Sequence, residues 1–188
     1  MDEGVEIDST LPWDIENIDE NQVVYRQIPA SKRTGNRPKK YPAEGNFALK
    51  DNEDSLSFNW ERYIDIPKNF SLLSITANSK GTLIDYTGFV IFKYPVSFLK
   101  SMEKFQDIKH SPLYIDCPSP VGKPNNKSHV SLYYDENDQG VRAQLSDYCL
   151  DNFEFSNCDF PISSIKHEIE ELRNRNNDTP YHNLWEFD

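Results

Sequence analysis

Five short runs of strand-forming residues, each bounded by turn residues, limit what this chain can fold into. The runs 22–28, 56–60 and 88–94 are rich in β-branched and aromatic residues or alternate apolar with polar positions. Two further alternating runs, 129–133 and 141–145, are separated by a polar loop that contains glycine, so they predict a hairpin. Short strands joined by turns predict a mostly antiparallel sheet.

Two helical segments accompany these strands. Pro95 suits the first turn of a helix, and apolar residues follow it at a spacing of three, which predicts a mid-chain helix over 96–106. A C-terminal helix is predicted from Pro161 to the Asn-rich stretch 174–177. Its apolar stripe consists of Ile162, Ile165, Ile169 and Leu172. The segment 70–77 fits either a strand or a short helix. We therefore predict a single-domain α+β fold with a mostly antiparallel sheet, a mid-chain helix and a packed C-terminal helix.

Charge is unevenly distributed along the chain. Residues 1–20 hold eight acidic residues and no basic one, without regular periodicity, so we expect a mobile acidic arm. The segment 26–40 holds six basic residues and no acidic one. The arm either folds back over this basic loop, or both stay solvated and independent. We expect the α+β domain to span 21–176 and an aromatic tail, 177–188, to dock on the body or on a partner.

The motifs of common enzyme classes are absent from the sequence. It contains no glycine-rich phosphate loop, no His-Glu-x-x-His, no Cys-x-x-Cys and no Gly-x-Ser-x-Gly. The three cysteines, Cys117, Cys149 and Cys158, are odd in number and irregularly spaced, which indicates reduced thiols. Together with His129 they match no zinc-ligand spacing, so we expect no metal and no cofactor.

Composition also indicates where the protein works. The first ten residues lack the basic and apolar regions of a secretory signal. The longest strongly apolar run, 88–92, is far shorter than the roughly 20 residues that a membrane helix needs. We therefore expect a cytoplasmic protein without a membrane partner. The many Asn and Lys residues are typical of an A/T-rich bacterial genome.

Two histidines near the edges of predicted strands are the candidates for catalysis. His110 lies just before Pro112, and His129 begins a predicted strand. Two such rings can act as acid and base in phosphodiester cleavage without a metal, or both can be structural hydrogen-bonding residues. The two hypotheses differ in whether the rings share a cleft.

Basic and aromatic residues form candidate binding sites. Arg26 and the basic loop that follows lie near Tyr25, a composition typical of sites for anions or single-stranded nucleic acid. The candidate anion- or partner-binding residues are Arg26, Arg33, Arg37, Lys39, Lys40, Trp185 and Phe187. The net charge of −11 disfavours nucleic acid. Trp60 is expected in the core, whereas Trp13 and Trp185, near the termini, are expected to contact another protein chain.

Four segments together resemble a family of short bacterial proteins of unknown function. They are Arg-x-Ile-Pro at 26–29, Leu-Ser-x-Asn-Trp at 56–60, His-x-Pro at 110–112 and the Asn-x-x-His that ends at His129. The resemblance covers residues 23–133 and implies no known activity. It adds weight to four residues as candidates for a functional role: Arg26, Trp60, His110 and His129.

These observations favour a non-enzymatic interaction module, an accessory subunit of a bacterial multiprotein complex. An alternative is a small metal-independent enzyme that cleaves RNA or phosphoesters with His110 and His129, while Arg26 or Lys127 holds the phosphate. A third hypothesis, an ADP-ribosyl-transferring toxin, depends only on the position of Arg26 in the first strand.

Overall fold

One antiparallel sheet and two helices make up most of the part of the chain that the computed structural model describes. The described residues are 12–28, 42–63, 90–114, 126–135, 139–152, 158–159 and the single positions 167, 171, 174, 175 and 178. The strands are β1 (Val23–Ile28), β2 (Leu56–Trp60), β3 (Val90–Pro95), β4 (Phe105–His110), β5 (His129–Tyr134) and β6 (Cys158–Asp159). The helices are α2 (Val96–Ser101) and α3 (Gln139–Asp151), with single 3₁₀ turns η2 (Glu44–Phe47) and η3 (Glu61–Tyr63).

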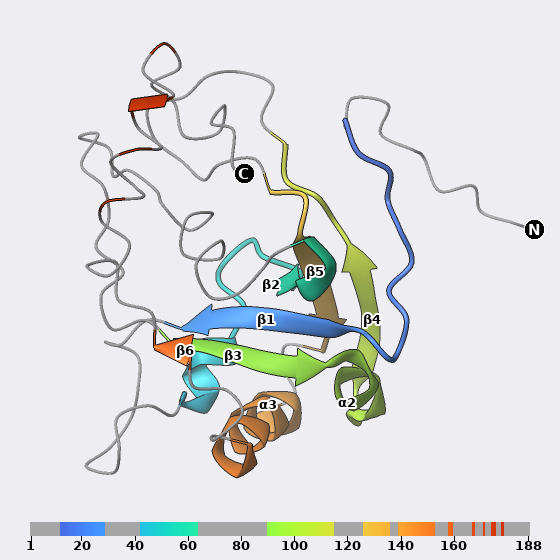
Figure 1. Ribbon diagram of the computed structural model, residues 1–188. Helices are drawn as coiled ribbons and strands as arrows, with labels where there is room; N and C mark the ends of the chain where they lie inside the picture. The colour runs from blue at the N-terminus through green and yellow to red at the C-terminus, as the bar shows by residue number, and fades with distance from the viewer. Residues whose placement is uncertain are drawn as a thin grey trace, which may run out of the picture.

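The strands pair in the order β4-β5-β2-β1-β3-β6, and every neighbouring pair is antiparallel (Figure 1). Val24 of β1 is opposite Trp60 of β2 on one side and Tyr94 of β3 on the other. The strands predicted at 22–28, 56–60, 88–94 and 129–133 are confirmed as β1, β2, β3 and β5. The predicted fold class, α+β with a mostly antiparallel sheet and a mid-chain helix, is confirmed as well, and α3 is the helix packed on the sheet toward the C-terminal end.

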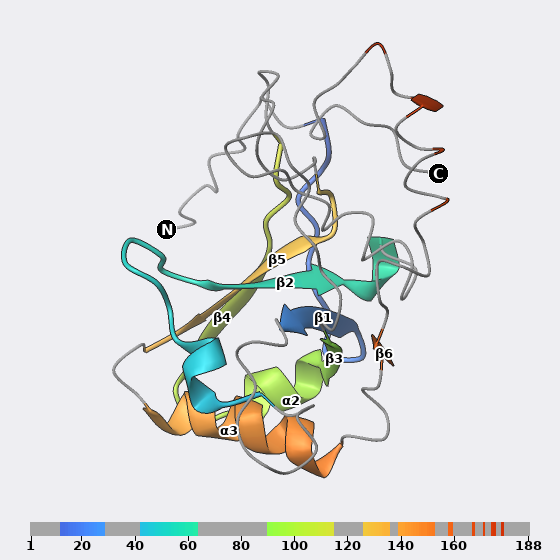
Figure 2. The same ribbon diagram turned by 90° about the vertical axis from the view of Figure 1, so that its left-hand side faces the viewer.

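The apolar core lies on one face of the sheet, on the side where both helices are found (Figures 1 and 2). The strand residues that are buried on this face include Val24, Phe58, Trp60, Tyr94, Val130 and Leu132. Leu99 of α2 and Val141 and Leu145 of α3 belong to the same cluster. A fully buried large apolar side chain contributes about 1.5–3 kcal/mol, so burial on this face holds the helices to the sheet. Trp60 is in the core, as expected.

The mid-chain helix is shorter than the sequence predicts, because α2 ends at Ser101 and not at residue 106. Lys104 adopts a left-handed φ of 89°, which an α-helix does not accommodate. Phe105 then starts β4 and pairs with β5. A spacing of three residues falls behind the helical turn of about 3.6, so a continued helix would carry Phe105 to the side opposite Val96.

The hairpin predicted from 129–133 and 141–145 is wrong, because the second run lies within α3. Over five residues the apolar positions alternate as in a strand. Over the longer segment Val141, Leu145 and Cys149 recur every four residues, and all three are buried. That spacing is typical of a helix with one apolar stripe. The partners of β5 are β2 and β4 instead.

Strand β4 is the last strand on its side of the described sheet, and a side chain bonds to one of the backbone groups on its outer edge. The Ser111 N–H donates to the His129 carbonyl and therefore points toward β5. N–H directions alternate along a strand, and Ile108 is three positions before Ser111, so the Ile108 N–H points away from β5. The Asp107 Oδ1 accepts that N–H at 2.8 Å, and Asp107 Oδ2 lies 3.2 Å from Lys109 Nζ. A register shift near the start of β4 also interrupts the ladder.

Residues 12–20, here called the strap, pass the C-terminal end of β4, where the Glu16 N–H bonds to His110 (Figure 1). Ile18 is 7 % exposed and joins the core, and the Glu20 carbonyl accepts the Ser97 N–H at the start of α2 at 3.1 Å. The charge pattern predicts that residues 1–20 form a mobile arm. The strap, which is part of this arm, contacts the body of the protein because Ile18 fills a position in the core. Residues 1–11 lie outside the described residues.

Most of the predicted C-terminal helix also lies outside the described residues. The positions described within it, His167, Glu171, Asn174 and Arg175, are helical. Its apolar stripe, the segment 70–77 and the tail beyond Asp178 are not among the described residues, so their predicted structures stay predictions.

Candidate functional site

His110 ends β4, is 3 % exposed, and has both ring nitrogens hydrogen-bonded to backbone groups. The Glu16 N–H of the strap donates to Nδ1 at 3.1 Å, and Nε2 lies 2.6 Å from the Lys127 carbonyl oxygen. A backbone N–H can only donate and a carbonyl can only accept, so the ring proton is on Nε2. His110 is therefore neutral in this arrangement and joins the strap to the segment before β5.

Two aromatic rings flank His110, and each of them also contacts a cation. Its ring stacks on Tyr63 with centroids 5.6 Å apart and meets Trp60 edge-on at 5.2 Å. The Arg62 guanidinium lies 5.5 Å from the Trp60 ring, and the Lys127 ammonium lies 4.3 Å from the Tyr63 ring. Each such cation–π contact contributes about 0.5–1 kcal/mol at an exposed site. The two ring contacts fix the plane of the His110 ring, and the cations hold Trp60 and Tyr63 in turn.

His129, at the start of β5, is 8 % exposed and forms a different set of contacts. Its Nδ1 lies 2.7 Å from the Ser111 carbonyl oxygen and 3.0 Å from the Ser111 hydroxyl. That hydroxyl is in turn 2.8 Å from the Ser131 hydroxyl. Because the carbonyl can only accept, Nδ1 carries a proton, and the ring is tied to the loop that follows β4.

The two histidine rings lie on opposite faces of the sheet. His110 is directly opposite Val130 in the β4–β5 register, so these two side chains share the core face. His129 precedes Val130 along the same strand, and successive side chains alternate between faces. An acid–base pair needs both rings within reach of one reacting group. The sheet separates His110 from His129, and each ring has a nitrogen engaged by the backbone.

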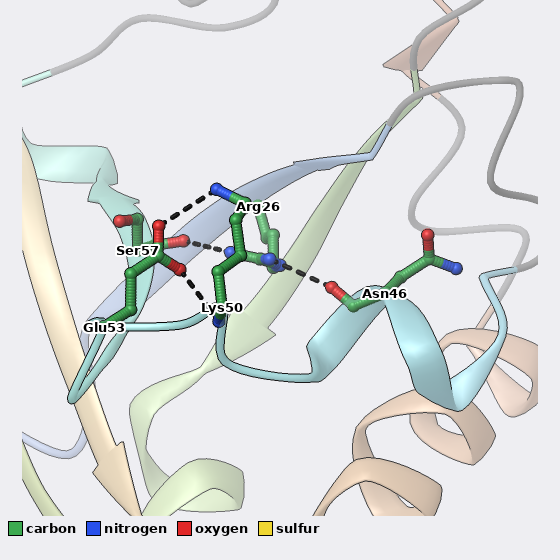
Figure 3. Close-up of polar contacts among 5 residues, drawn as sticks. All are labelled: Arg26, Asn46, Lys50, Glu53 and Ser57. Carbon is green, nitrogen blue, oxygen red and sulfur yellow. Dashed lines mark hydrogen bonds and ion pairs between the residues drawn. The ribbon is translucent and has the colours of Figure 1, made fainter. Parts of the chain in front are cut away.

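Arg26 of β1 projects onto the core face. Its Nη1 donates to the Ser57 carbonyl at 2.6 Å and its Nη2 to the Asn46 carbonyl at 3.0 Å (Figure 3). The centroids of the Phe47 and Phe58 rings lie 5.8 and 5.7 Å from the guanidinium carbon. Arg26 therefore connects β1 to β2 and to η2.

The charge of Arg26 is held in an apolar setting. Desolvation lowers the pKa of Arg26 to about 10, and Tyr94, Tyr134 and Glu53 offset part of that shift. The Glu53 carboxylate itself accepts from the Nζ and the N–H of Lys50 at 2.9 and 3.3 Å (Figure 3). Arg26 thus remains protonated at neutral pH. Its Nε is buried and has no hydrogen-bond partner in the described part of the structure, although the residue as a whole is only half-buried.

The strap places apolar side chains in solvent near His110. Trp13 meets Tyr114 edge-on with ring centroids 6.0 Å apart. Tyr114 is 38 % exposed and Ile15 is 49 % exposed; with Leu150 of α3 they are the large hydrophobic residues exposed in the described part of the chain. We call Trp13, Ile15 and Tyr114 the apolar patch. The sequence indicates Trp13 by its place near the terminus, whereas Ile15 and Tyr114 carry no signal that separates them from core residues.

The remaining candidate binding residues, Arg33, Arg37, Lys39, Lys40, Trp185 and Phe187, lie outside the described residues, so their roles stay predictions. Within the described ranges, no three His, Cys, Asp or Glu side chains are grouped so that they could hold a metal ion. No helix in that part of the chain has the length and apolar character needed to span a membrane.

Comparison with protein-family models, with curated proteins and with solved structures finds no match. The resemblance to short bacterial proteins therefore stays a prediction. The function has to be inferred from the contacts of His110, His129 and Arg26 and from the apolar patch.

Proposed function

We propose that this chain is a non-enzymatic interaction module, an accessory subunit of a bacterial multiprotein complex. The observation that carries the proposal is the apolar patch, in which Tyr114, 38 % exposed, meets Trp13 edge-on and Ile15, two positions after Trp13, is 49 % exposed. Aromatic residues are enriched at protein interfaces, where a few anchors contribute most of the binding energy. Trp185 and Phe187 of the tail are proposed as further anchors on the same grounds.

The proposed partner is another protein chain that presents basic residues around an apolar contact. The strap residues Asp14, Asp19 and Glu20 are exposed and acidic, and the chain has a net charge of −11. A basic surface on the partner would raise the association rate and fix the orientation of the two proteins. The same charge repels nucleic-acid backbones, which is why a protein is the favoured partner.

The contacts of the histidines disfavour the alternative, an enzyme that cleaves RNA or phosphoesters. His110 and His129 face opposite sides of the sheet, so one phosphate group cannot reach both. Lys127, the candidate for holding the phosphate, lies against Tyr63 on the side of His110. The two Nη atoms of Arg26 are bonded to carbonyl groups.

Co-purification with the tagged full-length chain, from cells that express it naturally, tests the proposal. Replacing Trp13 and Tyr114 with Ala should weaken binding of the specific partner about thirtyfold, because truncating one true anchor costs about 2 kcal/mol or more. Leu150→Ala is the matched control, since Leu150 is 52 % exposed on α3 and should not affect binding. A correctly folded double variant that retains the partner at wild-type yield would contradict the proposal.

A second assay addresses the enzyme alternative. The purified chain is incubated with an unstructured RNA, and no cleavage is expected. Cleavage by the wild type that disappears in folded His129→Asn would establish the alternative and overturn the interaction module.

A further inference from the structure

We propose that His110 is a pH-sensitive latch: the neutral ring holds the strap, and with it two residues of the apolar patch, whereas the protonated ring releases them. The effect of the latch on a partner rests on the proposed function, but the release of the strap does not. His110 and Glu16 are 94 positions apart in the chain and meet through a single hydrogen bond.

That hydrogen bond can be made only by the neutral ring. Nδ1 of His110 accepts the Glu16 N–H at 3.1 Å, so it must carry a lone pair. In the protonated ring both nitrogens carry a proton, and two donors would then face each other at this distance. The bond from Nε2 to the Lys127 carbonyl, at 2.6 Å, is present in both protonation states. Protonation therefore breaks the contact to the strap and keeps the contact to the body.

The charged groups around His110 do not compensate for this loss. Glu16 faces the ring from the strap, Arg62 from η3 and Lys127 from the segment before β5, while the neighbours on β2 and β5, Trp60 and Val130, and the stacked Tyr63 are uncharged. The Glu16 carboxylate is already paired with Arg62 at 2.9 Å. A protonated ring would thus contact Trp60 and Tyr63, two rings that already hold cations, with the carboxylate of Glu16 engaged elsewhere, while His110 is only 3 % exposed to water.

Protonation displaces the strap and not the ring, because the ring is held by more contacts than residues 12–16 are. Stacking on Tyr63, the edge of Trp60 and the Lys127 carbonyl all fix His110. The far end of the strap is anchored separately, since Ile18 is in the core and the Glu20 carbonyl bonds to α2. Release is therefore confined to residues 12–16, which include Trp13 and Ile15. The Glu16–Arg62 ion pair and the Trp13–Tyr114 ring contact do not depend on the charge of His110, but both lie at the surface, where such contacts are weak. Histidine is the side chain whose charge ordinarily changes between pH 5 and 8, which is why the latch is tested at pH 7.5 and 5.5.

Amide hydrogen exchange of the full-length chain, followed by NMR at pH 7.5 and 5.5, tests the latch. The ring-nitrogen shifts of His110 report its protonation in the same samples. We expect the protection of the Glu16 amide, corrected for the intrinsic pH dependence of exchange, to fall about tenfold, as for the loss of one hydrogen bond. The Trp60 amide, which donates to the Ser128 carbonyl at 2.7 Å in the sheet, should keep its protection and so report that the fold is intact.

Three results would overturn the latch. In the first, Glu16 protection stays constant while the His110 ring becomes protonated. In the second, His110 stays neutral down to pH 5.5. In the third, Trp60 loses protection in parallel, which means global unfolding. None of these readouts involves a partner, so their failure leaves the proposed function standing, and loss of the proposed function leaves the latch testable.

Two variants sharpen the result. His110→Phe keeps a ring to stack on Tyr63 but has no acceptor, so the Glu16 amide should exchange rapidly at both pH values. His129→Asn, on the opposite face, should retain the wild-type pH dependence. If His110→Phe does not fold, the titration of the wild type still decides.

Discussion

Tyr94 and Cys149 share a hydrogen bond in the middle of the core, with the hydroxyl oxygen and Sγ 2.5 Å apart. The same hydroxyl donates to the Leu145 carbonyl at 3.1 Å, so the thiol is the donor to Tyr94. Burial raises the pKa of Cys149 to about 12, although the charge of Arg26 and a hydrogen bond that the Tyr94 hydroxyl would donate to the thiolate offset part of the shift. Burial and the neighbouring Cys149 also raise the pKa of Tyr94. Both groups are therefore neutral in the folded protein, and they join β3 to α3.

We expect Cys149 to be unreactive toward alkylating reagents in the folded state. Only the thiolate reacts, and raising the pKa from 9.0 to about 12 lowers the thiolate fraction at pH 8 on the order of a thousandfold. Peptide mapping by mass spectrometry after a timed exposure to iodoacetamide measures the modification of Cys149. The same peptide in urea is the control. Comparable rates in the two states would show that the thiol is accessible and ionised.

The Tyr94–Cys149 pair should make the protein sensitive to alkali. Because the pKa of Cys149 is higher in the folded than in the unfolded chain, its contribution to stability is fully present below about pH 9 and is lost as pH rises toward 12. The pKa of Tyr94 shifts in the same direction. We expect the free energy of unfolding to fall by about 1 kcal/mol per pH unit for each group, above pH 9 for Cys149 and above pH 10 for Tyr94. Urea unfolding of Cys149→Ala should give a shallower slope; an equal slope would rule out the thiol as the cause.

Replacing Arg26 should destabilise the fold. Arg26→Ala leaves the Ser57 and Asn46 carbonyls without their donors and opens a space beside Phe47 and Phe58. We expect the free energy of unfolding in urea to fall by about 3 kcal/mol. Arg26→Met keeps most of the packing and should cost less. A stable Arg26→Ala variant that no longer binds the partner would make Arg26 a binding residue instead.

Two isoleucines of the strap provide a matched test of its anchoring. Ile18 is 7 % exposed, whereas Ile15 is 49 % exposed. Ile18→Ala should lower the free energy of unfolding by about 2–4 kcal/mol, and Ile15→Ala should change it by less than about 0.5 kcal/mol. Equal, small effects in both variants would return the whole of residues 1–20 to the mobile arm that the charge pattern predicts.

The strands could be predicted where the local sequence pattern alone agrees with the side chains that the folded protein buries. In β2 the alternation of apolar and polar residues coincides with one buried face, and β1 is marked by β-branched and aromatic residues that end at a proline, so local sequence is sufficient for both. The end of α2 and the start of β4 could not be predicted from local sequence. The left-handed turn at Lys104 and the pairing of Phe105 depend on β5, which comes more than 20 residues later. For α3, five residues suggested a strand, while thirteen show the helical spacing.

The candidate site was predictable in residue type but not in geometry. The prediction that His110 and His129 lie at strand ends is correct. The face that each ring occupies is decided by the register between β4 and β5, which the local sequence does not reveal. Arg26 is different, because it alternates with Val24 and Ile28, and those two apolar neighbours already indicate that its side chain points inward.

The carboxylate of Asp107 has a consequence for the behaviour of the protein at high concentration. An unpaired strand edge is a template on which identical chains can add one after another into fibrils. On β4 the outward N–H of Ile108 is already bonded to that carboxylate, and Lys109 adds a charge that an incoming strand would have to displace. Asp107→Ala removes the bonded carboxylate and the counter-charge of Lys109, so β4 is where fibril growth would begin in such a variant.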